Sequence, residues 1–369
     1  MKKILTYFRN EVVLTIALLA ALASFLLVPP GMHTLEGIDV TTLLMLFSLM
    51  AIVAGFRHMG AFDKLAGAVT RRVRTLRSLA MVLVTGCFLL AMVATNDVAL
   101  ITLVPFTLLL MRGAQMKHLT LTVVLETIAA NLGSMVTPIG NPQNLYLYSS
   151  GRLTALDFPA LTWPFAALAF ALLMALCWLL PREAVQAAAG AGGKLPGRKL
   201  ALYAALTVLA LLALAKILPD WALAAAVLAA LLMMDRDVLR QVDYTLLMTF
   251  VCFFVFVASV KAYAPISAWL EGLMAGSPLV TSLLASQVIS NVPACLLLSP
   301  FTQDAPALML GVNLGGLGTL VASLASLISF RLYGAAEGAK RGQFMLVFTA
   351  LNGLFLAAMA ALAWALGAL

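Results

Sequence analysis

Charged residues are scarce in this chain of 369 residues. Asp, Glu, Lys and Arg make up 10% of it, whereas 63% is hydrophobic and the mean hydropathy is +1.05. Soluble globular domains contain about 25% charged residues, so the composition excludes a water-soluble protein. Apolar runs long enough to cross a hydrocarbon core of about 30 Å recur along the whole sequence. We therefore expect an all-α integral membrane protein, multi-pass, in the inner (cytoplasmic) membrane.

Residues that carry enzyme or metal chemistry are also few. The chain has three histidines, no HExxH motif, and four cysteines without CxxC spacing. All four cysteines lie inside apolar runs, so we expect buried thiols without a disulfide or metal role; they are Cys87, Cys177, Cys252 and Cys295. These gaps argue against an enzyme. We also expect no cofactor.

Basic residues account for the net charge of +8, and their positions follow a pattern. If the N-terminus is cytoplasmic, all but three of the 23 Lys and Arg residues fall in cytoplasmic segments. This bias follows the positive-inside rule, so the basic excess indicates topology and not nucleic-acid binding. The C-terminus then lies outside. The sequence predicts about nine crossings, two of them broken helices, near residues 10–28, 40–57, 118–148, 159–180, 200–217, 220–234, 243–260, 305–332 and 344–367.

One polar sequence inside apolar surroundings occurs twice. Residues 131–137 read NLGSMVT and residues 313–319 read NLGGLGT. Upstream of each copy lies a second matching pair, TND at 95–97 and SNV at 290–292. Paired polar, Gly-rich breaks at matching positions of two membrane-embedded halves are typical of the substrate site of a secondary transporter.

The two halves are expected to be inverted relative to each other. Asp39 and Asp243 each begin a crossing in a similar sequence, and an odd number of predicted crossings separates them. Two inverted-topology repeats present similar faces to opposite sides of a membrane, as alternating access requires. We therefore divide the chain into a first repeat (1–182), a cytoplasmic linker (183–199) and a second repeat (200–369).

Two segments between the crossings are predicted to be re-entrant helical hairpins. Residues 279–289 and 292–303 would each form a helix of about 18 Å, which is too short to cross, so the tip between them lies inside the membrane. Symmetry places residues 95–97 at the tip of an opposite hairpin (78–112), although its arms are long enough to cross alone. Non-helical backbone at this depth needs protein or a water-filled cavity around it, so a cavity is expected.

The crossing at 118–148 contains the sequence TPIGNPQN, from Thr137 to Asn144. Pro138 and Pro142 each remove a backbone donor and Gly140 relaxes the chain, so the helix must break. Helix N-termini at such breaks favour an anion, and helix C-terminal carbonyls suit a small cation. The expected substrate- and ion-binding residues are Thr95, Asn96, Asp97, Asn131, Thr137, Gly140, Asn141, Asn144, Ser290, Asn291, Asn313, Gly315, Thr319 and Ser323.

Two carboxylates are candidate proton or cation carriers, Asp97 and Glu126, because an acid inside a membrane is by default a functional hypothesis. The alternative is that Asp97 caps a helix and that Glu126 pairs with Lys117 or His118 near the cytoplasmic interface. No Arg or Lys falls at the predicted midplane, so an anion would be held by helix dipoles and amides. A Na⁺ site is expected near Asn96, Asp97, Asn291 and Thr319.

Two amphipathic segments lead into the hairpins. Residues 61–77 place apolar side chains such as Phe62 and Leu76 on one helical face and basic residues on the other, which is typical of an interfacial helix. The segment that begins at Ala264 is its counterpart on the outer surface. The pair is expected to act as arms between a fixed and a mobile unit.

These motifs resemble the ion transporter superfamily, which includes the arsenite permeases, the NhaD-type sodium/proton antiporters and the dicarboxylate/sodium symporters. The similarity is greatest to its YbiR-type branch and depends on TNDVAL (95–100), NLGSMVTPIGNPQN (131–144), SNVPA (290–294) and NLGGLGTLVASLASLI (313–328). The resemblance implies a homodimer with scaffold and transport domains and an elevator-like displacement.

The resemblance also implies roles for particular residues. Thr95, Asn96, Ser290 and Asn291 would line substrate and cation sites at the hairpin tips, and the loops 137–144 and 319–323 would complete sodium sites. The symporters have Ser-Asn-Thr at both tips, whereas this chain has Asp97 and Val292 at the third position. That departure leaves sodium stoichiometry and dicarboxylate specificity open.

The leading functional expectation is a cation-coupled (Na⁺ or H⁺) secondary active transporter of a small anion, either a carboxylate or an inorganic oxyanion. The alternatives are a Na⁺/H⁺ antiporter that uses Asp97 and Glu126, and an arsenite or metalloid efflux permease. The expected partners are a small anionic solute, the lipid bilayer and a second copy of the chain. The sequence does not specify the solute, the coupling ion or the direction of flux.

Overall fold

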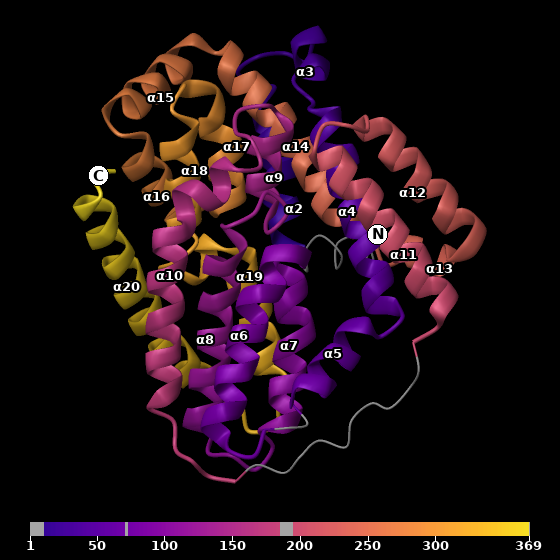
Figure 1. Cartoon of the computed structure of the whole chain (residues 1–369). Coiled ribbons are helices and arrows are strands. Elements are labelled where there is room, and N and C mark those ends of the chain that lie inside the picture. The colour runs from indigo at the N-terminus through magenta and orange to yellow at the C-terminus, as the bar shows by residue number, and fades with distance from the viewer. Residues whose placement is uncertain (1–10, 71–72, 185–194, 369) are drawn as a thin grey trace.

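A computed structural model describes residues 11–70, 73–184 and 195–368, and every regular element within them is helical (Figure 1). The first half contains α2 (Val12–Ser24), α3 (Met32–Glu36), α4 (Val40–His58), α5 (Ala61–Thr70), α6 (Leu76–Ala94), α7 (Asn96–Leu110), α8 (Met116–Ser134), α9 (Pro142–Ser149) and α10 (Asp157–Trp178). The second half contains α11 (Gly197–Leu214), α12 (Asp220–Met234), α13 (Arg236–Leu239), α14 (Tyr244–Ala262), α15 (Ala264–Gly276), α16 (Pro278–Ile289), α17 (Asn291–Leu298), η1 (Ser299–Phe301), α18 (Ala305–Leu314), η2 (Leu320–Ala322), α19 (Leu324–Gly334) and α20 (Arg341–Ala365). The all-α class is confirmed for the described residues.

Six described helices are long and apolar enough to cross a membrane: Thr34–His58 (the end of α3 with α4), α6, α10, α11, α14 and α20. The shorter α2 and α12 match two further expected crossings, and the pairs α8–α9 and α18–α19 match the two broken ones. Since α6 is among the six, length does not distinguish a re-entrant arm from a crossing. The number of crossings and the re-entry of the first hairpin stay predictions.

The two expected hairpins have the same turn geometry. The helices α6 and α7 pack against each other and are joined at Thr95, and α16 and α17 pack together and are joined at Ser290. Thr95 has φ 87° and ψ 150°, and Ser290 has φ 73° and ψ 154°. A positive φ is rare for residues with a side chain, and for β-branched Thr it is strained, so surrounding contacts must hold both tips.

The surface helix before the first hairpin is shorter than expected. The sequence predicted an interfacial helix over 61–77, but α5 ends at Thr70 and α6 begins at Leu76. The reason is a capping box, in which the Ser78 N–H donates to Thr75 Oγ1 and the Thr75 N–H donates to Ser78 Oγ, both at 3.3 Å. The expected arm on the other side is α15, which is bent by 120° relative to α16.

The predicted linker 183–199 lies largely outside the described residues, which exclude 185–194. At its start the Glu183 carbonyl accepts a hydrogen bond from the Leu76 N–H at 2.8 Å, and at its end α11 begins at Gly197. The boundaries drawn between the repeats and the linker stay predictions.

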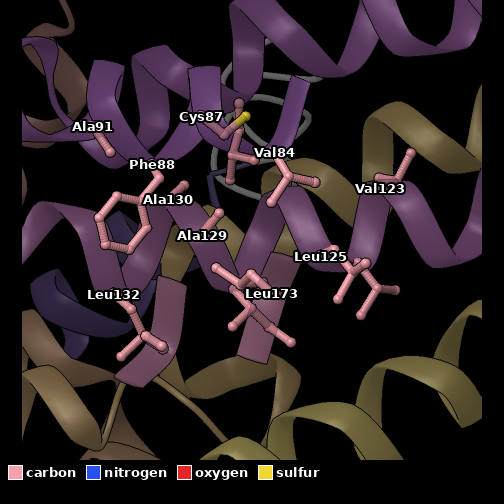
Figure 2. Close-up of a cluster of buried hydrophobic side chains, with 14 of the residues drawn as sticks. Val84, Cys87, Phe88, Ala91, Val123, Leu125, Ala129, Ala130, Leu132 and Leu173 are labelled. Carbon is pink, nitrogen blue, oxygen red and sulfur yellow. The ribbon is translucent and has the colours of Figure 1, made fainter. Parts of the chain in front are cut away.

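Buried apolar side chains form two clusters. One joins α6, α7, α8, α10, α19 and α20, the other joins α2, α4, α9, α11, α12, α14 and α17, and α18 contributes to both. Figure 2 shows part of the first cluster, where Phe88 of α6 lies near Ala129 and Ala130 of α8. All four cysteines are buried and free, so the expectation of buried thiols is confirmed.

Glycine permits a close contact between α6 and α8. A Cβ at Gly133 of α8 would lie 2.3 Å from the Phe88 carbonyl oxygen of α6. Small residues let helix backbones approach closely in membranes, where packing rather than water expulsion drives association. The broken helix α8 is thereby held against the first arm of the hairpin.

Candidate functional site

The two hairpin tips rest on the loops that break α8–α9 and α18–α19. In the first half, the Asn96 N–H donates to the Gly140 carbonyl at 2.9 Å. In the second half, Ser290 Oγ donates to the carbonyl of Ala322 at 3.3 Å. Gly140 and Ala322 occupy equivalent places in the two loops, since each directly precedes the N-cap residue of the following helix. An equivalent loop carbonyl therefore supports each tip, through a backbone N–H in the first half and a hydroxyl in the second.

A threonine in each loop repeats this equivalence. Thr137 Oγ1 donates to the Met92 carbonyl at 2.5 Å, and Thr319 Oγ1 donates to the Gln287 carbonyl at 2.9 Å. Met92 and Gln287 each lie three residues before their tip. The loop hydroxyl thus satisfies a carbonyl that the end of α6 or α16 leaves open.

The two halves also exchange hydrogen bonds with each other. Asn141, which caps α9, donates through Nδ2 to Asn313 Oδ1 at 2.9 Å, and Asn313 Nδ2 donates to Asn144 Oδ1 at 2.7 Å. The mirror arrangement joins Ser323 Oγ to Asn131 Oδ1 at 3.0 Å. Asn313 of α18 therefore pairs with the start of α9, and Asn131 of α8 pairs with the start of α19.

The same asparagines connect both tips to this exchange. Asn131 Oδ1 also accepts from Asn96 Nδ2 at 3.3 Å, and Asn131 Nδ2 donates to the Gly316 carbonyl at 3.4 Å. Asn291 of the second tip lies close to the same loop, since a Cβ on Gly316 would lie 3.0 Å from Asn291 Nδ2. Both tip asparagines are 5% exposed. The two tips and the two loops thus form one buried polar network.

The network uses most of the expected site residues on one another. Hydrogen bonds within it account for the side chains of Asn131, Thr137, Asn141, Asn144, Asn313, Thr319 and Ser323. Two glycines serve close approach, because a Cβ would lie 2.0 Å from the Ser134 carbonyl at Gly140 and 2.7 Å from Ser286 Cβ at Gly315. These residues position the helix ends, and the groups left open to a solute lie at the tips.

A cavity of about 130 Å³ reaches the first tip. Thr95, Asp97 and Asn141 line it at the tip, and Arg57 and Asp243 line it on α4 and before α14. The lining is otherwise mainly apolar and comes from α4, α7 and α9. A water-accessible space beside the tip was expected from sequence, and it opens between the hairpin and α4.

Asp97 is one of two acids that line this cavity, the other being Asp243. The alternative expectation that Asp97 caps a helix is wrong, because the cap of α7 is Thr95, whose Oγ1 accepts from the Val98 N–H at 3.5 Å. Asn96 Oδ1 accepts from the Asp97 N–H at 2.9 Å, and in the second half Asn291 Oδ1 accepts from the Val292 N–H at the same distance. Within the described residues we find no hydrogen bond or ion pair to the Asp97 carboxylate.

Glu126 lies elsewhere. It is fully buried in α8, its Oε1 accepts from Thr107 Oγ1 at 2.6 Å, and its Oε2 has no partner among the described residues. The alternative expectation of a pair with Lys117 or His118 is not met, since the described ion pairs all involve Asp235. Glu126 does not line the cavity.

Gln287 is a structural residue that was not predicted from the sequence. Its Nε2 donates to the carbonyls of Gly315 and Leu317 at 2.8 and 2.9 Å, and its Oε1 accepts from the Thr319 N–H at 3.0 Å. The signal that could have found it is a lone amide three residues before a tip in an apolar helix.

As for metals, no group of three His, Cys, Asp or Glu side chains gathers anywhere in the described ranges, so a Na⁺ site would use carbonyl, amide and hydroxyl oxygens.

Comparison with known proteins decides the family. The family model described as "Citrate transporter" matches residues 4–323. The chain belongs to this citrate transporter family. It is 35% identical over 304 residues to the inner membrane protein YbiR of Escherichia coli (strain K12), with 80% of each chain covered. An uncharacterized transporter of Methanocaldococcus jannaschii is 30% identical over 320 residues, with 86% and 87% covered.

The fold is also that of a transporter. The crystal structure of the YdaH transporter of Alcanivorax borkumensis aligns with a TM-score of 0.54 over 90% of this chain and 86% of that one, at 15% identity. The expected membership of the ion transporter superfamily is confirmed, and so is the expectation of a transporter rather than an enzyme. The protein is a multi-pass membrane transporter of this family.

Proposed function

We propose that the protein is a secondary active transporter that moves a small anion, coupled to Na⁺ or H⁺, through an elevator-type displacement. The observation that carries the proposal is the meeting of the helix starts of α7, α9, α17 and α19 in one buried polar network, beside the free carboxylate of Asp97. Helix starts present N–H groups and partial positive charge, which an anion complements.

The anion class is supported by the charges around the network. Its side chains are amides and hydroxyls, and the nearest basic residue in the cavity lining is Arg57, at the C-terminal end of α4. Dipoles and amides can bind a small carboxylate or oxyanion without a cationic side chain. The family description names citrate, which is a carboxylate.

Coupling is supported by the position of Asp97. A carboxylate about 8 Å from a bound anion would oppose its binding by roughly 2 kcal/mol at an effective dielectric constant of about 20. A Na⁺ or H⁺ held at Asp97 removes that repulsion, so cation and anion bind more tightly together than alone. Reciprocal linkage of this kind is what coupling requires.

The elevator proposal rests on the arrangement of the helices. The cavity separates the first tip from α4, and its lining includes Arg57, Gln241 and Asp243, which positive-inside topology assigns to the cytoplasmic side. In Figure 1 the lower ends of α6, α7 and α8 reach beyond those of α4 and α11. We assign an inward-facing state, with α2, α4, α11, α12 and α14 as scaffold, α5 and α15 as arms, and a homodimer formed through the scaffold.

The test is uptake into proteoliposomes under separately imposed Na⁺, H⁺ and voltage gradients. A panel of citrate, succinate, malate, phosphate and arsenite separates carboxylates, an oxyanion and a neutral metalloid. We expect accumulation of at least one anion that collapses when the cation gradient is removed. Proton release on addition of Na⁺ without any anion would assign Na⁺/H⁺ antiport instead, and movement of arsenite alone would assign a metalloid permease.

A further inference from the structure

Gln143 at the start of α9 is a buried amide that the network does not use. It is 1% exposed, and neither its Nε2 nor its Oε1 has a hydrogen-bond partner. Among the described residues it is the only side-chain amide with both polar atoms buried and unpartnered. Most buried polar groups in proteins are paired, so an amide with two open positions needs an explanation.

The neighbours of Gln143 show how different it is from the other polar residues of its segment. Asn141 bonds to Asn313, and Asn144 bonds to Asn313 and to the carbonyls of Met135 and Thr137. These contacts hold the start of α9 in place without Gln143. The amide of Gln143 is therefore not required to form the break.

Gln143 lies in the first turn of α9, beside α17. Helical side chains lean toward the N-terminus of their own helix, so the amide of the second residue of α9 extends toward the first turn. α17 lies alongside, because Cys295 Sγ is 3.9 Å from the Gln143 carbonyl oxygen. Pro142 and Leu145, on an adjacent face of α9, line the cavity that contains Thr95 and Asp97. A solute in that cavity is one helix face away from the amide.

The other half of the molecule has no counterpart. The residue equivalent to Gln143 is Ala325, at the same place after the start of α19, and it is fully buried. Apolar packing is thus the ordinary solution at this site, and the first half departs from it with a polar group. A departure from efficient packing at a binding site is expected where function requires it.

We infer that Gln143 is a specificity-determining residue that binds the solute through paired donor and acceptor groups. This inference rests on the proposed anion transport. Because both Nε2–H and Oε1 are open, the complementary ligand presents an acceptor oxygen beside an O–H group. A hydroxycarboxylate or a singly protonated oxyacid has such a pair, whereas a fully ionised dicarboxylate offers only acceptors. The amide therefore selects hydroxylated anions.

The test compares anions that differ by one hydroxyl group. Purified protein is heated with citrate or tricarballylate, with malate or succinate, and with phosphate, at constant ionic strength, and the rise in Tm gives the affinity of each. We expect the hydroxylated member of a pair to bind the wild type at least tenfold more tightly. Gln143→Met keeps the length of the side chain and removes both polar atoms, so it should erase that difference.

Stability separates a binding role from a structural one. Without an anion, Gln143→Met should leave Tm unchanged or raise it, because it removes two unpartnered polar atoms. Gln287→Met is the matched control and should lower Tm, since it removes four hydrogen bonds. A lower Tm for Gln143→Met without anion would show that the amide is structural and would overturn the inference.

The anion data distinguish the two remaining failures. If citrate or malate protects the wild type and Gln143→Met equally, anion binding stands and the role of Gln143 is wrong. If none of the five anions protects the wild type or enters proteoliposomes, the proposed anion transport fails and the assignment of Gln143 fails with it.

Discussion

The cavity beside the first hairpin tip is charged, whereas the space beside the second is apolar. Asp97, Arg57 and Asp243 line the first. A cavity of about 240 Å³ lies beside Ser290, and its other lining residues are all apolar, among them Phe253 and Pro293. The tips themselves have the same backbone geometry and equivalent loop contacts. The two tips therefore share their backbone conformation, but only the cavity beside the first tip is lined by titratable side chains.

The difference has a physical origin in a few substitutions. Asp97 of the first tip corresponds to Val292 of the second, and Gln143 of α9 corresponds to Ala325 of α19. The asparagines and small hydroxylated residues that hold tips to loops occur in both halves. The two halves thus have equivalent residues where these hold the fold together, and they differ where a solute or cation would bind.

Removing the asparagine of the second half should have the largest effect on stability. Asn313→Ala leaves one of the two N–H groups of Asn141 Nδ2, and Asn144 Oδ1, without a partner in a buried site, at about 1–3 kcal/mol each. Asn131→Ala should cost less, because the bonds it loses are longer, at 3.0–3.4 Å. Thermal unfolding of both variants in one detergent measures the order. Equal losses, or a larger one for Asn131→Ala, would show that the two halves are not held as described.

Alanine at the glycine of the first half should have an intermediate effect. In Gly133→Ala the new Cβ would lie 2.3 Å from a backbone oxygen that cannot rotate away, and such overpacking costs about 1–3 kcal/mol. In Gly315→Ala the nearest atom belongs to the side chain of Ser286 at 2.7 Å, so the loss should be smaller. Gly353→Ala is the control, because nothing lies within 4 Å of its Cβ position. Unfolding temperatures that rank Gly353→Ala lowest would contradict the packing.

Neutralising the buried acid should have the smallest effect. Glu126→Gln keeps an acceptor for Thr107 and lies outside the cavity, so stability should change by less than about 1 kcal/mol. The cation dependence of anion uptake should be the same as in the wild type. Loss of that dependence in Glu126→Gln, at normal expression, would make Glu126 a cation carrier and would move the coupling chemistry away from the tip.

Much of the architecture could be predicted from the sequence because its signals are local. The prolines of the 137–144 segment predict the break between α8 and α9, and the short arms around Ser290 predict the second hairpin. The cross-half exchange between Asn313 and Asn141 could not be predicted, since it depends on how two distant breaks face each other. Gln287 was missed for the same reason.

The local errors have local causes. The cap of α7 was expected at Asp97 and lies at Thr95, because a tip residue with positive φ takes the cap position and leaves Asn96 and Asp97 in the first turn. The interfacial helix was extended too far, because its apolar period continues through Leu76, which belongs to α6. The spacing of apolar residues does not reveal a capping box at which a new helix starts.

The most direct test of the account is the cation dependence of anion uptake in Asp97→Asn compared with Val292→Asn. Both substitutions place an asparagine at the third tip position, and they differ in whether a carboxylate is lost. We predict that Asp97→Asn lowers the stimulation of uptake by the cation gradient at least tenfold and that Val292→Asn retains it. Undiminished stimulation in Asp97→Asn, with normal expression and Tm, would contradict coupling at the first tip.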